Sequence, residues 1–225
     1  MTILKSLVKN ILLALRDILD PLFRFREVAV LCYHEYDPHL ESHITALKTR
    51  GYEFVPLADI VAWVKGATSF QRKKMVAITF DDGYPDFESQ VLPLLVRYSV
   101  PVTLFATGTF DTTRLRGREG VEIGNHTKTH PNLTKLEPAQ IDTEVARAGE
   151  RYFAYPGGNH SPQATAAVRR AGYEAAFTIR PVLVRQGRDP YLLPRAVITP
   201  DMGLCDVLFY ASKAADWYCS LKIYG

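Results

Sequence analysis

The stretch Ile78-Thr79-Phe80-Asp81-Asp82-Gly83 ends an apolar, β-branched run that begins at Met75. The run predicts a strand, and the glycine lets the backbone turn sharply, so the two carboxylates are expected just past the end of that strand. Adjacent like charges repel each other, and a cation that neutralises one carboxylate leaves the other free for acid/base chemistry. The stretch therefore indicates a site built around a cation.

Two histidines supply the further ligands that such a cation needs. They are His126 and His130, in Gly124-Asn125-His126-Thr127-Lys128-Thr129-His130. Histidines four residues apart share one side of a helical turn, and both can then reach a single metal ion. The spacing predicts a three-ligand metal site formed by Asp82, His126 and His130.

The rest of the chain alternates short apolar runs with amphipathic ones. This β-α alternation predicts one α/β domain over residues 27–225, with parallel strands wrapped by helices in a closed or nearly closed barrel. A final helix is expected over residues 204–218. Strands are expected at residues 28–33, 53–56, 75–80, 101–106, 121–124, 152–155, 175–179 and 193–198.

Reactive side chains of such barrels gather at the carboxyl ends of the strands. His34, Asp81, His126 and Pro156 each come at the end of a different expected strand, and Arg195 lies near the start of the last one. We expect these positions to share one rim, which makes the rim the candidate site.

The composition and charge of the chain bear on its size class and on whether it binds nucleic acid. The chain has 225 residues, 47% of them apolar, and a net charge of +3. That length suffices for a sizeable core in one domain. The lysines and arginines are scattered and not clustered between aromatic residues, so no nucleic-acid partner is predicted.

Residues 1–26 form a separate amphipathic segment. Leu4, Leu7, Val8, Ile11, Leu15, Ile18, Leu19 and Leu22 recur at helical spacing, and Pro21 is expected to end the helix. The apolar run is too short to span a bilayer and has no small-residue cleavage site, so the segment is neither a membrane span nor a signal peptide. Contact with a membrane surface, packing on the domain and contact with a partner chain remain open. The expected location is cytoplasmic, and peripheral contact at the inner face of the membrane is one of these open alternatives.

Three motifs resemble those of the polysaccharide deacetylases of the NodB-homology type, carbohydrate esterase family 4. They are Thr79-Phe80-Asp81-Asp82-Gly83, His126-Thr127-Lys128-Thr129-His130 and Phe153-Ala154-Tyr155-Pro156-Gly157-Gly158. Leu31-Cys32-Tyr33-His34 and Leu193-Pro194-Arg195 resemble the branch that acts on surface polysaccharides. The resemblance runs from about Val28 to the final helix. It implies a distorted (β/α)7-type barrel, the glycoside hydrolase/deacetylase-like fold.

The resemblance also implies an activity, the removal of N-acetyl groups, as acetate, from an N-acetylated polysaccharide or glycan precursor. The three-ligand site would hold one divalent cation, zinc first, with cobalt, nickel and manganese as alternatives. Asp81 matches the general base. Gly157 matches the position whose backbone N–H binds the oxyanion, beside Tyr155 and Pro156.

The chain departs from the family pattern at two chemical groups. Ala154 stands where many members carry an arginine that steadies the catalytic aspartate, and Arg195 is the candidate replacement. No histidine follows His160, so the usual late general acid is missing, and His34 ranks ahead of His160 for that role.

The connections at residues 109–121 and 148–153 are also short for the family, and an open substrate groove is therefore expected. Two alternatives follow from these departures: a catalytically weakened glycan-binding protein, or a hydrolase of another linear amide with the same metal site.

Overall fold

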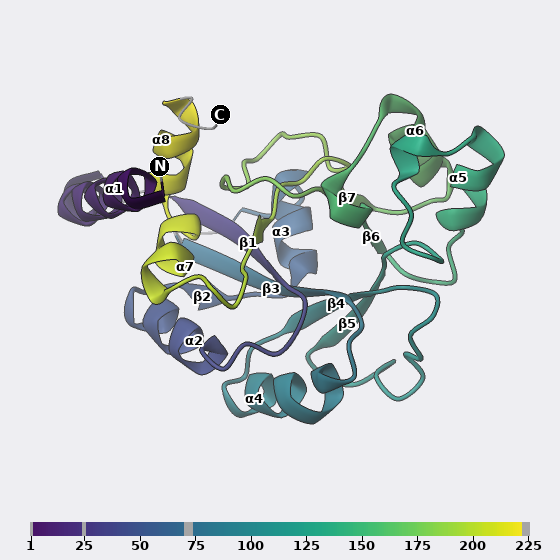
Figure 1. Ribbon diagram of the computed structural model, residues 1–225, viewed down its shortest axis with the longest axis horizontal. Coiled ribbons are helices and arrows are strands. Elements are labelled where there is room, and N and C mark those ends of the chain that lie inside the picture. The colour runs from purple at the N-terminus through teal and green to yellow at the C-terminus, as the bar shows by residue number, and fades with distance from the viewer. Residues whose placement is uncertain (1, 24–25, 70–73, 222–225) are drawn as a thin grey trace.

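The protein is described by a computed structural model that covers residues 2–23, 26–69 and 74–221. Its centre is one curled sheet of parallel strands in the order β7-β6-β5-β4-β3-β1-β8, with β2 also paired to β3 (Figure 1). The strands are β1 (Glu27–Tyr33), β2 (Glu53–Phe54), β3 (Lys74–Asp82), β4 (Val102–Ala106), β5 (Val121–Asn125), β6 (Tyr152–Ala154), β7 (Ala175–Phe177) and β8 (Ala196–Val197).

The two ends of this sheet approach each other. Phe177, at the end of β7, forms a parallel bridge with Leu193, which leads into β8. The Leu193 carbonyl accepts a hydrogen bond from Thr178 N at 2.8 Å, and Leu193 N donates to the Ala176 carbonyl at 3.0 Å. The bridge nearly closes the sheet, so the predicted distorted (β/α) barrel is confirmed.

Helices connect the strands; α3 packs on the inner face of the sheet, and helices such as α2 cover the outer face. The predicted last helix over residues 204–218 is in fact two helices, because Ser212 caps the second one by accepting a hydrogen bond from Ala214 N. The helices are α1 (Thr2–Phe23), α2 (Leu40–Thr49), α3 (Leu57–Val64), α4 (Leu92–Arg97), α5 (Pro138–Glu144), α6 (Pro162–Arg170), α7 (Leu204–Tyr210) and α8 (Lys213–Ser220), with short helical turns at Phe87–Val91, Leu133–Lys135 and Pro156–Gly158.

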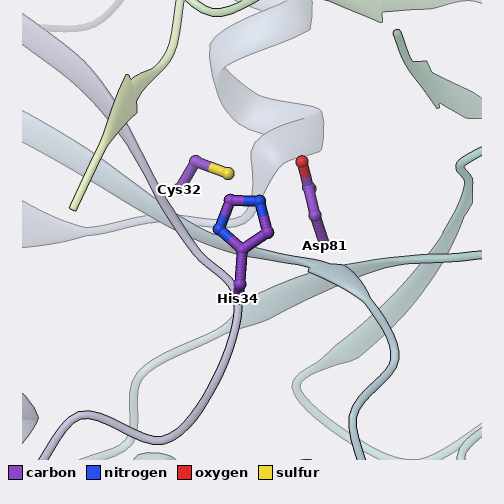
Figure 2. A group of neighbouring side chains, drawn as sticks. All are labelled: Cys32, His34 and Asp81. Atoms are coloured by element: carbon purple, nitrogen blue, oxygen red, sulfur yellow. The ribbon is translucent and has the colours of Figure 1, made fainter. Parts of the chain in front are cut away.

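The inner face of the sheet is apolar at its base and polar at its carboxyl end. One buried cluster on this face combines residues of the adjacent strands β1, β3 and β4 with a residue of the distant strand β7 and with α3: Val28, Met75, Phe105 and Phe177. Side chains alternate between the two faces of a strand, so Cys32 follows Val28 and Val30 on this face, and Thr79 and Asp81 follow Met75 and Ala77. Figure 2 shows Cys32 and Asp81 at this end, with His34 between them.

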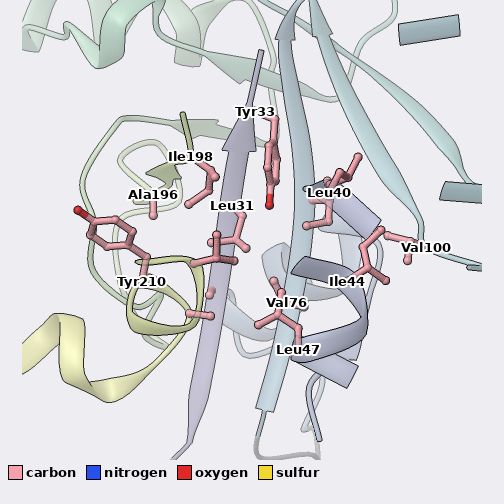
Figure 3. Close-up of a cluster of buried hydrophobic side chains, with 14 of the residues drawn as sticks. Leu31, Tyr33, Leu40, Ile44, Leu47, Val76, Val100, Ala196, Ile198 and Tyr210 are labelled. Carbon is pink, nitrogen blue, oxygen red and sulfur yellow. The ribbon is translucent and has the colours of Figure 1, made fainter. Parts of the chain in front are cut away.

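The outer face packs against the helices in a larger cluster. Leu31 and Tyr33 of β1 and Val76 of β3 contact residues of α2, such as Leu40 and Leu47 (Figure 3). Burying a large apolar side chain contributes about 1.5–3 kcal/mol each, so this layer provides much of the fold's stability.

Helix α1 docks on the outer layer through charged side chains. Arg16 is 3% exposed and binds Glu27, the first residue of β1, whose carboxylate also accepts hydrogen bonds from the Tyr52 hydroxyl at 2.6 Å and Lys213 N at 2.8 Å. Pro21 lies inside α1, which continues to Phe23. The expectation that Pro21 ends the helix is therefore wrong, although the helix stops only two residues later.

Glu27→Gln is expected to lower the free energy of unfolding by about 3–5 kcal/mol, because it leaves the buried Arg16 without its counter-ion. Urea unfolding measures the change. The matched control is Glu41→Gln, whose partner Arg97 is 65% exposed and whose loss should be below about 1 kcal/mol. Equal losses for the two variants would show that the Arg16–Glu27 pair does not anchor α1.

Candidate metal centre

Asp82, His126 and His130 meet at the carboxyl ends of β3 and β5. Nε2 of His126 lies 3.6 Å from Oδ1 of Asp82, and Nε2 of His130 lies 3.4 Å from the same oxygen. One ligand atom from each of the three residues lies within 4.8 Å of the other two. Two imidazoles and one carboxylate in this arrangement suit a zinc-like cation and leave part of its coordination shell open.

The orientation of His126 supports this assignment. Its Nδ1 lies 2.8 Å from the carbonyl oxygen of Ala154, which can only accept, so Nδ1 carries the hydrogen and Nε2 presents its lone pair to Asp82. Burial lowers the pKa of His126 and favours the neutral ring that a metal ligand requires. The residues therefore fit a divalent cation.

The backbone around these ligands is strained. Among the described non-glycine residues, Asp82, Ser99, Thr127 and His130 have positive φ, and three of these four belong to the site. The segment 126–130 is not helical, so the prediction that both histidines lie on one helical turn is wrong. Thr127 N bonds to Asn125 Oδ1 at 2.7 Å and His130 N to Thr127 Oγ1 at 2.9 Å, and these bonds hold the loop in a conformation that costs about 1–3 kcal/mol per residue.

The turn after Asp82 depends on Gly83. Its φ is +89°, and a Cβ at this position would lie 2.4 Å from Cγ of Phe110. Asp81 and Asp82 are the last two residues of β3. The expectation that they lie past the end of the strand is therefore wrong, because the strand continues two residues further than predicted.

Asp81 is bonded to Arg195 and also borders the Asp82 site, because its Oδ2 lies 3.7 Å from Nε2 of His126. The guanidinium donates two hydrogen bonds to the Asp81 carboxylate, at 2.6 and 2.7 Å, and a third to Thr79 Oγ1 at 3.2 Å. Both side chains are at most 1% exposed, and Arg195 also stacks on the Phe105 ring at 5.0 Å. Burial alone would raise the pKa of Asp81, but Arg195 and His126 outweigh it and bring that pKa down to about 2.

His34 lies on the other side of Asp81. Ligand atoms of Cys32, His34 and Asp81 lie within 4.8 Å of one another, and the His34 ring stands between the other two side chains in Figure 2. This second group does not suit a metal, because Arg195 occupies both Asp81 oxygens and burial raises the pKa of the Cys32 thiol. What it provides is an imidazole beside the candidate base.

The turn after β6 contains the three residues predicted for the oxyanion site, and they do not all play the same part. Tyr155 points into the protein, where its hydroxyl bonds to the Tyr191 carbonyl at 3.2 Å, and its N–H is bonded to the Phe177 carbonyl. Pro156 has no N–H. Of the three predicted oxyanion-site residues, Gly157 alone can therefore offer a backbone donor, while Tyr155 and Pro156 shape the turn.

Two cavities lie beside the rim. One of about 220 Å³ is lined by Tyr33, His34, Asp37 and Thr199, among others. The other, of about 260 Å³, is lined by Thr107, Asn125, Thr127 and Lys128 and by the short connection before β6. Sequence reasoning did not single out Asp37. Asp37 accepts a hydrogen bond from His39 N just before α2. An aspartate immediately ahead of an amphipathic run is typical of a helix start, and this pattern could have indicated Asp37 in the sequence.

The short connections also border a larger groove of about 510 Å³. Its lining includes Val102 and Val121, the first residues of β4 and β5, together with Arg116 and Arg151. This groove therefore lies at the strand starts, away from the carboxyl-end rim.

Residues 69–176 match a protein-family model described as Polysaccharide deacetylase. These residues belong to the polysaccharide deacetylase family. The family is one of hydrolases that includes chitooligosaccharide and peptidoglycan deacetylases.

Two curated relatives agree with this membership. The chain is 25% identical over 182 residues to a putative polysaccharide deacetylase, YxkH, of Bacillus subtilis (strain 168), covering 72% of this chain and 65% of that protein. It is 36% identical over 102 residues to a chitooligosaccharide deacetylase of Bradyrhizobium sp. (strain ANU 289), covering 43% of this chain and 45% of that protein. The chain thus spans less than two thirds of either relative's length.

Two solved structures share the deacetylase fold. The Streptococcus pyogenes deacetylase PplD, in complex with acetate, superposes with a TM-score of 0.69 at 19% identity, covering 83% of this chain and 98% of that chain. IcaB from Ammonifex degensii gives 0.70 at 24% identity, with the same coverage. At these identities the likeness establishes the fold alone.

Arg195→Met is expected to lower the free energy of unfolding by about 3–5 kcal/mol, because the buried Asp81 loses its counter-ion. The double variant with Asp81→Asn should recover part of that loss, since no uncompensated charge remains. Urea unfolding of the single and double variants gives the coupling energy. Arg169→Met, which breaks an exposed ion pair with Asp189, is the control. A double variant no more stable than Arg195→Met would contradict the assigned pairing.

Proposed function

We propose that the protein is a metal-dependent N-deacetylase that removes N-acetyl groups, as acetate, from an N-acetylated polysaccharide or glycan precursor. The observation that carries the proposal is the division of labour between two adjacent aspartates. Asp82 faces two histidines, while Asp81 is bonded to Arg195. This is the separation that a cation site beside a general base requires.

The metal ligands would be Asp82, His126 and His130, with zinc as the first candidate. When bound, the divalent cation would polarise the acetyl carbonyl and make the attacking water more acidic. That contribution is needed here, because a carboxylate with a pKa of about 2 is a weak base on its own.

The other groups of the chain would carry the proton transfers. Arg195 holds Asp81 ionised and fixes its orientation, so that Asp81 accepts the proton of the attacking water. Gly157 N–H donates a hydrogen bond to the oxygen that becomes negative in the tetrahedral intermediate. His34, beside Asp81, donates a proton to the departing amine when the C–N bond breaks. The products are acetate and a free amino sugar.

The cavities beside the rim support an extended substrate. One borders His34 and the other borders Thr127, so a sugar unit on each side of the reacting one would find a hollow to enter. A cytoplasmic location at the inner face of a membrane stays a prediction.

Asp82→Asn and Asp81→Asn should separate metal binding from catalysis. Asp82→Asn is expected to weaken zinc binding at least about 10-fold in equilibrium dialysis. Loss of a residue that only hydrogen-bonds to a metal ligand already lowers metal affinity by about this factor, and loss of a ligand should lower it at least as much. Asp81→Asn should still bind zinc but release acetate from N-acetylated chitooligosaccharides about 10²–10⁴ times more slowly. Asp142→Asn, an exposed carboxylate on α5, is the control for both measurements.

Chelator should abolish acetate release by the wild type, and zinc should restore it. Zinc binding without acetate release from any N-acetylated glycan would overturn the proposed function and favour a glycan-binding protein. Faster release from small linear amides than from glycans would instead favour a different amide substrate.

His34→Asn is expected to slow release from N-acetyl substrates about 10²–10⁴-fold, because the departing amine must be protonated. Aryl acetates, whose phenolate leaving group needs no proton, should lose far less activity. His160, which is exposed and bonded to the Gly158 carbonyl, supplies the control variant His160→Asn. Equal losses on both substrate types would rule out His34 as the acid.

A further inference from the structure

Helix α1 presents its apolar side to solvent. Five of its large apolar side chains are 44–77% exposed, and among the described residues they make up half of the exposed large hydrophobic positions. With Ala14 they form a continuous row along the helix, which we name the apolar ridge: Leu7, Ile11, Ala14, Leu15, Ile18 and Leu22. A helix of 22 residues is about 33 Å long, so the ridge is a large surface.

The charged side chains of α1 face the domain. Lys9 bonds to Asp206 at 2.8 Å and to the Tyr210 hydroxyl at 3.0 Å. Further along, Arg16 binds Glu27, and Asp20 accepts a hydrogen bond from Lys74 at 2.7 Å. Leu13 is buried on this side, and Val8 and Leu12 pack against the core. The five most exposed large apolar side chains nevertheless face solvent, whereas an ordinary surface helix buries its apolar side. The ion pairs fix the orientation of α1, so the ridge is held outward.

The ridge has the chemistry of a lipid-facing surface. On a helical wheel its residues, extended by the partly exposed Leu19, cover a broad arc, whereas a helix pair needs only a narrow seam. An amphipathic helix of this kind lies in a membrane interface with its broad apolar face buried. Among the described helices none is long and apolar enough to cross a membrane.

The charges at the edges of the ridge favour an anionic surface. Lys5 lies on α1 itself, Arg26 is exposed just after the helix, and Arg50 approaches from the end of α2. The acidic residue beside the ridge, Asp17, is paired with Arg16 at 2.7 Å and with Arg50 at 3.8 Å. Basic residues near a bilayer are attracted to anionic headgroups.

We infer that α1 is a docking helix that places its apolar ridge in the interface of an anionic lipid bilayer. The docked helix leaves the catalytic rim accessible. Arg16 and Asp20 contact the first residues of β1 and β3, while Asp81 and Asp82 end β3, about 26 Å away along the strand. Membrane contact and access of a glycan to the rim are thus compatible.

Vesicle sedimentation of the full chain tests the inference. The protein should sediment with phosphatidylcholine vesicles that contain phosphatidylglycerol, and less with phosphatidylcholine alone or at high salt. The double variant Ile11→Gln/Ile18→Gln should reduce the bound fraction at least about 10-fold, because it places amides in the centre of the ridge. The matched control is Val96→Gln/Leu204→Gln, which changes exposed apolar residues of α4 and α7 and should sediment like the wild type.

Each other outcome contradicts the inference. Sedimentation of the ridge variant at the wild-type level would show that the ridge is not the contact. Absence of vesicle binding, together with a dimer in light scattering that the ridge variant abolishes, would assign the ridge to a second copy of the chain. Circular dichroism and urea unfolding confirm that the variants are folded. Vesicle sedimentation does not depend on acetate release, so failure of the lipid contact and failure of the proposed deacetylase activity are distinguishable.

Discussion

The buried ion pair between Arg195 and Asp81 links the closure of the sheet to the chemistry of the site. Arg195 lies one residue before β8, and Asp81 lies near the end of β3, with β1 between the two strands. Removing two charges from water costs several kcal/mol per ion, and the cost is offset only where the geometry is good and further favourable contacts are made. Here the bidentate contact, Thr79 and the Phe105 ring supply them. The last strand must be in place before Asp81 is oriented.

A second buried ion pair performs a comparable task at the opposite end of the sheet. Glu27 begins β1 and gathers Arg16, Tyr52 and the N-terminus of α8 around one carboxylate. One pair thus orients a reactive group at the carboxyl end of the strands, and the other orients a helix at their amino end. In both cases a buried ion pair fixes the orientation of a neighbouring group: the Asp81 carboxylate at one end of the sheet and helix α1 at the other.

Strain is concentrated where the ligands converge. Asp82, Thr127 and His130 adopt left-handed backbone conformations, each unfavourable for a residue with a side chain. The paired strands β3, β4 and β5 fix the start of each of these turns. The side chains of Asn125 and Thr127 hold the loop after β5 by accepting hydrogen bonds from Thr127 N and His130 N. A rigid sheet therefore tolerates a conformation that an isolated peptide would leave.

The sequence by itself determined the barrel class, the order of its strands along the chain and the identity of the candidate groups at their ends. Periodic apolar runs and a few motif residues, such as Asp81 and His126, contain that information locally. It did not determine how the histidines converge, because a four-residue spacing fits a helical turn as well as the strained loop that the structure shows. Nor could it decide that Arg195 meets Asp81, or that α1 turns its charges inward. Arg195 and Asp81 are 114 positions apart and meet only when the sheet closes, whereas Arg16 reaches Glu27, 11 positions later, only when α1 docks at the start of β1.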